Sequence, residues 1–465
     1  MNIKKIYLLA LTLLGFTFFS CKDDNTTDDL SGYTDALCTE FVLTDNSNIM
    51  DDLSEVYFTI DQYGILEDGR MVGQIYNADS LPVGTKVSKL LAEMTFNSPK
   101  KVMLYTSAKD SVEYSSTDSI DFSNPVTMKV TAYNNINVKY YTLKVNVHKQ
   151  VGDSIDWQNF VSEPLSNAGI ISSQKAVSFN GNVYWFVVNE LNQNLLYTAA
   201  ADDLKNWNRS TLTISGNPSM NLLSLKVFEN AMYMLSENGN LYKSTNASTW
   251  NIVNTGKKFV NLIGSYTYSL SEKQFIGLVK DGEKIYFSYS NDGENWANNG
   301  EISSTFPISG YTDGAQYSGG TASTVNGLVI VGGRYQNGYL SNYTWAYDGN
   351  NWASFKPGPF MGLEGATLVT YENDPRYSNT FWLLIGGKTN LGYTNNIYYS
   401  SNKGVSWSLV SEKFTFPSSH QARGFSSVYV DSNFFINLFG GEDKSGQFNQ
   451  IWRGRLNQLA FTPVE

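Results

Sequence analysis

The segment "SNKGVSW", Ser401 to Trp407, places a tryptophan directly after a short polar turn. The same arrangement precedes four other tryptophans, in "ADDLKNW" ending at Trp207, "STNASTW" at Trp250, "SNDGENW" at Trp296 and "AYDGNNW" at Trp352. Trp157 and Phe461 extend the series to seven positions, separated by 50, 43, 46, 56, 55 and 54 residues. Periods of this length with several short strands per unit are typical of β-propeller blades. The intervals predict an all-β domain of six blades over residues 151–465.

The repeated tryptophan has a structural and a functional interpretation. A four-stranded sheet cannot bury both of its faces alone, so an indole at one equivalent position would fill the wedge between neighbouring blades. Burial of such a large aromatic contributes on the order of 3 kcal/mol. Stacking of the indoles on sugar rings is the alternative, and their equivalent positions disfavour it. The ring would be closed by the strand near Trp157, by the C-terminal "LAFTPVE", or by both.

Glycine pairs distinguish the last three repeats from the first three. Gly332–Gly333, Gly386–Gly387 and Gly440–Gly441 each follow an apolar strand and precede a later aromatic residue and tryptophan. In these features the repeats resemble kelch repeats. Turns with Asp202, Asn291 or Asn402 before the tryptophan resemble degenerate Asp-boxes instead, since such side chains close a hairpin by bonding the backbone two residues on.

Residues 33–150 carry the pattern of a smaller β domain. Apolar residues alternate with threonine, lysine and asparagine over residues 126–132 and 141–147, with "NNIN" at 134–137 as the hairpin loop. Earlier runs, "EFVLT", "EVYFTI", "MVGQIY" and "KVMLYT", supply further strands, and residues 87–94 show the spacing of a helical turn. The segment predicts a small sandwich of Ig-like type. Cys38 is expected to pack as a small apolar residue near its first strand rather than to act as a catalytic thiol.

The N-terminus has the layout of a lipoprotein signal. Two lysines and a short apolar run precede Cys21 in "FFSC", which resembles a bacterial lipobox, so residues 1–20 are expected to be a signal peptide and Cys21 the lipidated residue. An uncleaved anchor helix is the alternative. Residues 21–32 are acidic and polar and predict a flexible tether. A lysine and two acids after the cysteine resemble the surface-export signal of Bacteroidetes-type lipoproteins, which implies an outer-membrane protein that faces the cell exterior.

Charge and histidine content exclude several functions. The chain of 465 residues has a formal charge of −10, and without residues 1–20 it has 31 basic against 43 acidic side chains, so nucleic acid is not an expected partner. His148 and His420 are the only histidines, which argues against a multi-histidine metal site, and no phosphate-binding glycine loop is present. No metal, cofactor or catalytic residue is therefore predicted.

Six residues are candidates for ligand binding. His420 and Arg423 precede the inner strand of the last repeat, Arg334 follows a glycine pair, and a structural role is the alternative for each. The loop "SGYTDGAQYSGG", Ser309 to Gly320, presents Tyr311 and Tyr317 before another inner strand. Glu364, together with Asp313 and Glu442, could face the axis, where a pair of carboxylates would suit a glycosidase. Sialidases combine six blades with Asp-boxes, but their arginine motif is missing at the first blade.

After Cys21 the chain resembles Bacteroidetes-type surface lipoproteins that carry an N-terminal Ig-like domain and a C-terminal kelch-type propeller. The resemblance brings no activity with it. The favoured function is a non-catalytic cell-surface protein that binds a glycan or a protein partner and is monomeric unless it joins an outer-membrane complex. A glycoside hydrolase or sialidase-like enzyme and a scaffold subunit of an outer-membrane assembly are the alternatives.

Overall fold

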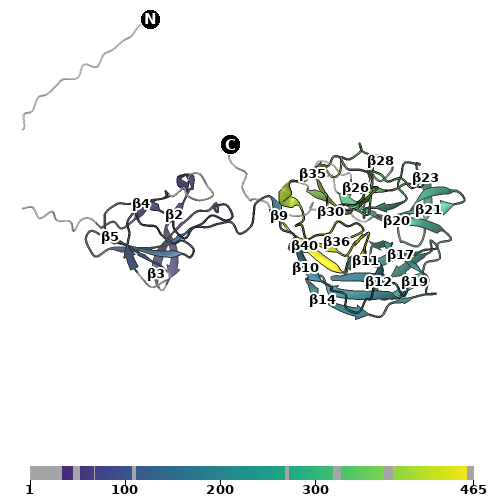
Figure 1. Cartoon of the computed structure of the whole chain (residues 1–465), viewed down its shortest axis with the longest axis horizontal. Helices are drawn as coiled ribbons and strands as arrows, with labels where there is room; N and C mark the ends of the chain where they lie inside the picture. Colours follow the sequence, from purple (N-terminus) through teal and green to yellow (C-terminus); the bar gives the residue numbers. More distant parts are fainter. Residues whose placement is uncertain are drawn as a thin grey trace, which may run out of the picture. The chain divides into compact units, whose positions relative to one another are not determined.

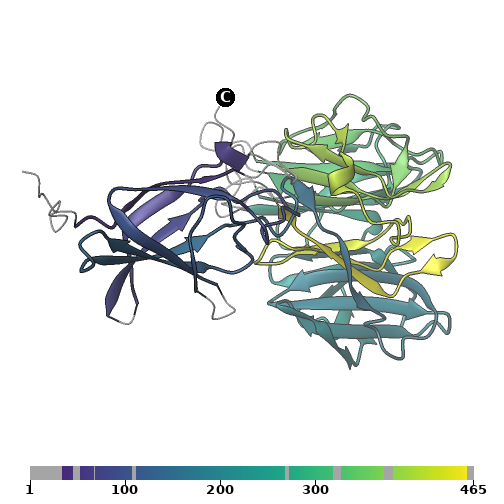
Figure 2. The ribbon, with the colours of Figure 1, turned by 60° about the vertical axis from the view of Figure 1, so that its left-hand side comes forward.

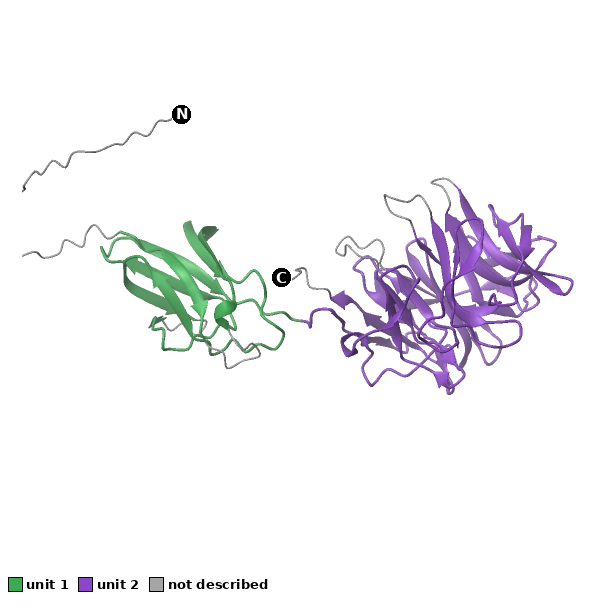
Figure 3. Cartoon of the chain, turned by 90° about the horizontal axis from the view of Figure 1, so that it is seen from above, with its two compact units in different colours: residues 1–149 green, residues 150–465 purple. Residues whose placement is uncertain are grey.

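The computed structural model describes residues 34–44, 53–67, 69–106, 111–267, 272–317, 326–370 and 381–457. The regular elements in these ranges are strands and two single-turn 3-10 helices, Leu53–Glu55 and Glu412–Phe414, so the protein is all-β. No helix in the described ranges is long and apolar enough to cross a bilayer. The chain divides into two compact units, residues 1–149 and 150–465 (Figure 3). The predicted signal peptide, Cys21, the tether, Phe461 and the "LAFTPVE" segment lie outside the described residues.

The first unit contains two sheets around one core. Its smaller sheet pairs β1 (Cys38–Leu43) with β4 (Ala92–Phe96). The larger sheet has the order β2-β3-β8-β7-β5-β6. These strands are β2 (Thr59–Glu67), β3 (Arg70–Tyr76), β5 (Pro99–Tyr105), β6 (Ser111–Glu113), β7 (Val126–Ala132) and β8 (Val138–Lys144). All neighbours in it are antiparallel except β3 and β8, which are parallel.

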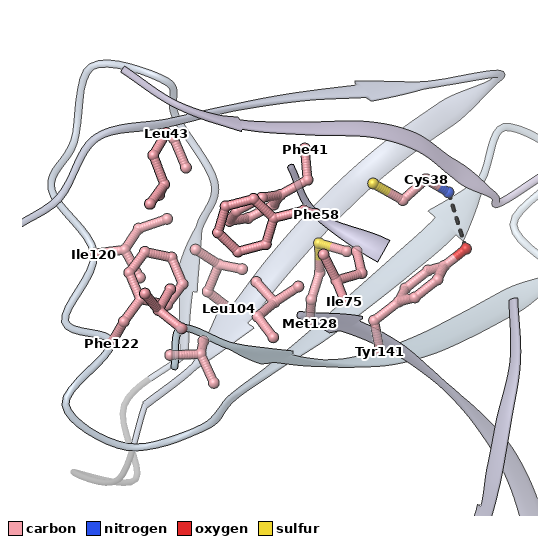
Figure 4. Close-up of a cluster of buried hydrophobic side chains, with 14 of the residues drawn as sticks. Cys38, Phe41, Leu43, Phe58, Ile75, Leu104, Ile120, Phe122, Met128 and Tyr141 are labelled. Atoms are coloured by element: carbon pink, nitrogen blue, oxygen red, sulfur yellow. Dashed lines mark hydrogen bonds between the residues drawn. The ribbon is translucent and has the colours of Figure 1, made fainter. Parts of the chain in front are cut away.

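The alternation that predicted β7 is confirmed by burial. Val126, Met128, Val130 and Ala132 are at most 1 % exposed and belong to the core between the two sheets. Cys38 is also fully buried there, as predicted, and burial raises the pKa of its thiol to about 12 (Figure 4). Figure 4 also shows the backbone N–H of Cys38 donating to the hydroxyl of Tyr141, at 2.9 Å.

The helical turn predicted at residues 87–94 is wrong. Leu90 instead forms a β-bridge with Ile120, the N–H of Phe122 donates to the carbonyl of Val87, and β4 begins at Ala92. Leu90 is buried and Val87 and Met94 are partly buried against the core, from a chain that pairs with residues 120–122. Apolar residues at helical spacing can therefore reach a core without a helix when a neighbouring segment satisfies their backbone groups.

The described residues of the second unit form six sheets of four or five strands. The sheets are numbered in chain order. Sheet one contains β11 (Ile171–Phe179), β12 (Asn182–Asn189), β13 (Asn194–Ala200) and β14 (Asp203–Ser210). Sheet two contains β15 (Thr213–Ile214), β16 (Met220–Phe228), β17 (Ala231–Ser236), β18 (Leu241–Ser244) and β19 (Thr249–Ile252), and sheet three contains β20 (Lys258–Thr267), β21 (Lys273–Asp281), β22 (Lys284–Ser290) and β23 (Ala297–Glu301).

The other three sheets follow the same plan. Sheet four is β24 (Ser309–Tyr311), β25 (Ala315–Tyr317), β26 (Gly327–Arg334), β27 (Thr344–Tyr347) and β28 (Trp352–Ser354); sheet five is β30 (Thr367–Thr370), β31 (Trp382–Ile385), β34 (Ile397–Ser400) and β35 (Ser408–Leu409); sheet six is β36 (Ser427–Val430), β37 (Ile436–Phe439), β40 (Gln450–Gly454) and β10 (Gln158–Ser162). Short pairings accompany them: β29 (Leu363–Glu364) with β32 (Lys388–Thr389) and β33 (Gly392–Tyr393), β38 (Glu442–Asp443) with β39 (Gly446–Gln447), and β41 (Leu456–Asn457) with β9 (Ser154–Ile155).

The six sheets make a closed ring. Contacts run from β11 to β16, β20, β25, β30 and β36 and back to β11, so the first strands surround a common axis. In Figure 1 the last strands β14, β19, β23, β28, β35 and β10 lie around the rim. The strand just after Trp157 closes the ring, because β10 pairs with β40 of sheet six. Figure 2 shows the result, with the yellow last strands beside the blue-teal strands of sheet one.

Five of the six tryptophans of the series lie at or next to the start of the last strand of a sheet, and Trp207 lies in the middle of β14. Each packs in or against the apolar cluster that joins its sheet to the preceding one. Trp250, for example, is fully buried and packs edge-on against Phe186 of sheet one, with ring centroids 5.7 Å apart. Trp157, Trp296 and Trp407 are also buried, whereas Trp207 and Trp352 are partly exposed. The prediction that these indoles fill the wedges between sheets is confirmed.

Candidate functional site

A cavity of about 110 Å³ lies at the axis of the ring. All six sheets contribute to it through their first strands or the residues just before them. Its lining comprises Lys175, Asn221, Leu223, Lys226, Asn261, Ser309, Gly310, Tyr311, Asp313, Gly365, Ala366, Thr367, Leu368, Phe425, Ser426 and Val428. Because the ring places segments that are distant in sequence around this space, the cavity is a candidate binding site.

Two lysines meet one aspartate in this cavity. The ammonium of Lys175, on β11, lies 2.7 Å from one carboxylate oxygen of Asp313, and the ammonium of Lys226, on β16, lies 2.6 Å from the other. Burial alone would raise the pKa of Asp313, but the two lysines outweigh it and hold that pKa below its usual value. Burial lowers the pKa of Lys226, and Lys175 lowers it further, while Asp313 opposes both effects.

Tyr311 also lines this cavity and carries an unpaired polar group. Its hydroxyl oxygen is buried and has no hydrogen-bond partner among the described residues. Burial and the negative charge of Asp313 raise the pKa of this phenol, which keeps it protonated and able to donate. A buried hydroxyl without a partner within the fold costs free energy and keeps its capacity to donate a hydrogen bond.

Three cavity residues have left-handed backbone angles, one inside β24 and two just before β30 and β36. Gly310, Gly365 and Phe425 have φ values of 65°, 66° and 59°. Glycine adopts this conformation freely, whereas a bulky side chain does so with strain. The N–H of Phe425 donates to the carbonyl of Gly365, and a Cβ on Gly365 would lie 2.7 Å from the Phe425 ring. Strain of this kind concentrates at functional sites, where packing holds it in place.

Of the predicted ligand residues, only Tyr311 lines the axial cavity. Arg334 and Glu364 are brought together, but they bind each other through two side-chain hydrogen bonds, and Arg334 also donates to the carbonyl of Gly338. Tyr317, at the end of β25, packs edge-on against Trp382 with the ammonium of Lys403 over its ring. Both arrangements hold loops and strands in place.

His420 and Arg423 lie in the interior between strands. His420 stacks on Phe416 with ring centroids 3.8 Å apart, its Nδ1 lies 2.9 Å from the amide oxygen of Asn395, and burial lowers its pKa to about 3. Arg423 donates to the carbonyls of Gln421 and Gly440 and to the side chain of Gln450, with its guanidinium over the Phe448 ring. The structural interpretation left open for Arg423 therefore accounts for all of these donors.

The other two carboxylates named from the sequence lie in different surroundings. Asp313 faces the axis as expected. Glu442 instead accepts hydrogen bonds from the hydroxyl of Tyr393 at 2.8 Å and from the side chain of Gln447 at 2.6 Å. Among the described residues no group of three or more histidine, cysteine, aspartate and glutamate side chains gathers as metal ligands would.

A second hollow, the aromatic groove, lies between sheets four and five. It measures about 310 Å³ and is lined by Pro359, Phe360, Met361, Leu363, Gly386, Thr389, Leu391, Gly392, Tyr393, Thr394, Asn396 and Tyr398. Phe360 and Tyr398 form one wall, with ring centroids 5.3 Å apart. Met361 and Leu391 are 53 % and 84 % exposed beside it.

Sequence reasoning missed the two axial lysines and the aromatic groove. Lys175 lies in the middle of the mixed strand "ISSQKAVSF", and Lys226 interrupts the largely apolar strand "NLLSLKVF". A charged side chain in the innermost strand of a ring is a signal that would have identified them, since such groups are rarely buried unless they are paired or used. The groove has no comparable signal, because its walls come from loops whose neighbours depend on the fold.

Family models match both units of the chain. Residues 19–145 match the domain described as the DUF6242 N-terminal domain, of unknown function, and residues 151–464 match the DUF6242 beta propeller domain. The chain belongs to the DUF6242 family. Its second unit is therefore a β-propeller, as the tryptophan period predicted.

Among curated proteins no relative matches the chain. Among solved structures, a mutant of the Aleuria aurantia lectin in complex with alpha-methyl-L-fucoside is similar at 12 % identity and a TM-score of 0.37, over 63 % of this chain and 97 % of the lectin chain.

Proposed function

We propose that this protein is a non-catalytic binding protein whose propeller takes a glycan in the aromatic groove. The observation that carries this proposal is the composition of the groove. The described residues that line it combine aromatic rings with hydroxyl and amide groups and include no charged side chain. A neutral sugar offers the matching surfaces, apolar C–H faces and many hydroxyls. The volume of about 310 Å³ is at the lower end of the range typical of small-molecule sites.

The tyrosines of the groove are held in place before any ligand arrives. The hydroxyl of Tyr393 donates to Glu442 at 2.8 Å, and the side-chain amide of Asn396 donates to the hydroxyl of Tyr398 at 3.2 Å. Rings fixed in this way lose little conformational entropy when a ligand packs against them. Preorganisation therefore supports binding by these two side chains.

The state of the carboxylates favours binding over hydrolysis. A two-carboxylate glycosidase needs one acid free to give a proton and a second free to act as base or nucleophile. Glu364 is bound by Arg334, and Glu442 by Tyr393 and Gln447. These contacts support a non-catalytic function.

A protein partner is the second candidate ligand. The exposure of Leu391 and Met361 beside the groove is the observation that favours it, because large apolar side chains in water gain from being covered. A protein would need to cover more of the surface than the groove alone.

The placement of the protein in the cell completes the proposal. Residues 1–20 act as a signal peptide, Cys21 carries the lipid, and the tether of residues 21–32 leads to an Ig-like spacer and a six-bladed, kelch-like propeller outside the outer membrane. The six sheets and the glycine pairs support the propeller assignment. Replacement of Cys21 by alanine should release the protein from membranes, and retention of this variant in the membrane fraction would contradict lipid anchoring.

The binding proposal is tested with the purified protein on a glycan array, with hydrolysis products followed by chromatography. Leu391→Ala and Tyr398→Ala should each weaken binding about tenfold, while Tyr339→Ala, at a tyrosine that is 70 % exposed and outside the groove, should leave it unchanged. Binding that persists in both groove variants would show that the binding site lies outside the aromatic groove. Release of sugar products would show that the protein is an enzyme and would contradict the non-catalytic proposal.

A further inference from the structure

The axial cavity is separate from the aromatic groove, since the described residues that line the two hollows do not overlap. We propose that this cavity is a second binding site, which takes one singly charged oxygen anion, such as the carboxylate of an acidic sugar, between Lys175, Lys226 and Tyr311. This inference does not rest on the proposed function, because it concerns other residues and a different chemistry.

The charge of the cluster leaves room for one anion. Two ammonium groups share a single carboxylate, so the cluster of Lys175, Lys226 and Asp313 carries one net positive charge when all three are ionised. Their contacts with each other cannot neutralise that charge, and burial makes an uncompensated charge costly. Among the described residues that line the cavity no other charged side chain is present. An incoming monoanion would neutralise the cluster.

The donors of the cluster are only partly used. An ammonium has three N–H donors, and each lysine has one hydrogen bond to Asp313 within the described part of the chain. The hydroxyl of Tyr311 has no partner there. These donors belong to three residues that line one cavity, on β11, β16 and β24, and an oxygen anion accepts hydrogen bonds from donors of this kind.

The size and accessibility of the cavity limit the ligand. A volume of about 110 Å³ admits a carboxylate and its neighbouring atoms rather than a whole oligosaccharide. The side chain of Asp313 is 46 % exposed although it lies at the axis, whereas those of Lys175 and Lys226 are 10 % and 11 % exposed. The exposed part of Asp313 shows that the cavity is wide enough to admit water-sized groups beside the cluster.

The types of donor also point to a monoanion. Arginine would offer a planar pair of donors suited to phosphate, whereas lysine acts as a point charge. A phosphate monoester carries nearly two negative charges near neutral pH and would leave the cavity with an excess of negative charge. A carboxylate or a sulfate ester matches the single positive charge.

Binding is measured by calorimetry on the purified protein with sodium D-glucuronate, and with D-glucose as the neutral counterpart. Glucuronate should bind and glucose should not bind at this site. Lys226→Met and Lys175→Met should each weaken glucuronate binding at least tenfold, and Tyr311→Phe should weaken it several-fold. Lys284→Met is the matched control, because this lysine is exposed, pairs with Glu301 and does not line the cavity, so binding should not change.

The source of the anion is settled by a second titration with sodium acetate. Acetate that binds with the same dependence on Lys226 and Tyr311 would identify small free carboxylates as ligands, whereas binding of glucuronate alone would identify acidic sugars. Tyr311→Phe changes one hydroxyl and keeps the ring, so it tests the site even if the lysine variants fold poorly. The proposal would be overturned if neither glucuronate nor acetate bound, or if their affinity stayed the same in the Lys175, Lys226 and Tyr311 variants.

Discussion

The rim and the axis of the propeller differ in how far their hydrogen-bonding groups are used. At the rim, the indole N–H groups of Trp207, Trp250 and Trp296 each donate to the carbonyl three residues earlier, at 2.8, 2.7 and 3.1 Å. At the axis, Lys175 and Lys226 use one donor each, and the Tyr311 hydroxyl uses none within the described residues. Burial is common to both regions. The indole N–H of Trp352 at the rim also has no partner among the described residues, so an unused donor alone does not mark a site. The axis differs because its unused donors belong to residues that line one cavity and carry a net charge.

The largest expected effect is at the rim. Trp250→Ala should lower the free energy of unfolding by about 3 to 5 kcal/mol, because it removes a fully buried indole and leaves a cavity between sheets one and two. Denaturant titration measures this loss. Trp207→Ala should have a smaller effect, since Trp207 is partly exposed. Equal losses for the two variants would contradict the wedge model.

The buried side chain of His420 should make stability depend on pH. The amide of Asn395 donates to the His420 carbonyl and its oxygen faces Nδ1, so Nδ1 carries the proton and the buried Nε2 has no partner among the described residues. Burial lowers the pKa of His420 to about 3, against 6.5 in an unfolded chain, so between these pH values the unfolded chain binds more protons. Stability should fall by a few kcal/mol as the pH is lowered from about 6.5 to about 3.

The pH dependence is measured by thermal unfolding across that range. His420→Gln should flatten the profile, because glutamine keeps a polar amide near Asn395 but does not titrate. A profile that keeps its slope in this variant would assign the effect to other groups.

The turn before each tryptophan should contribute less. Asp292 accepts hydrogen bonds from the backbone N–H groups of Glu294 and Asn295 at 2.8 and 2.7 Å, and these N–H groups, Asn295 first, lower its pKa. Asp292→Ala should cost about 1 to 2 kcal/mol in urea unfolding. Asp348→Ala removes the same two contacts in sheet four, at 2.8 and 2.7 Å, and should cost a similar amount. A neutral result in both would show that the turns are held by the strands alone.

The same contrast explains what the sequence could predict. Trp250 and the glycine pairs mark local requirements, a wedge and a left-handed turn, that recur with each sheet and are visible as a period. Both glycines of Gly332–Gly333 have positive φ. No periodic sequence pattern marks the axial cluster, because Lys175 and Asp313 are 138 residues apart and come together only when the ring closes. The helical spacing of apolar residues also gave a wrong prediction for residues 87–94, because this segment pairs with residues distant in sequence.

The smallest expected effect is at the axis, and it has a matched counterpart in the first unit. The hydroxyl of Tyr141 accepts from the N–H of Cys38 at 2.9 Å and donates to Gln62 at 2.6 Å, so Tyr141→Phe leaves buried partners unpaired and should cost about 1 to 3 kcal/mol. Tyr311→Phe removes a hydroxyl that has no such partners and should change the free energy of unfolding by less than about 0.5 kcal/mol, or raise it. Both values come from urea unfolding of the ligand-free protein. If Tyr311→Phe destabilised the protein as much as Tyr141→Phe, its hydroxyl would already be bonded within the fold, and the axis would no longer differ from the rim.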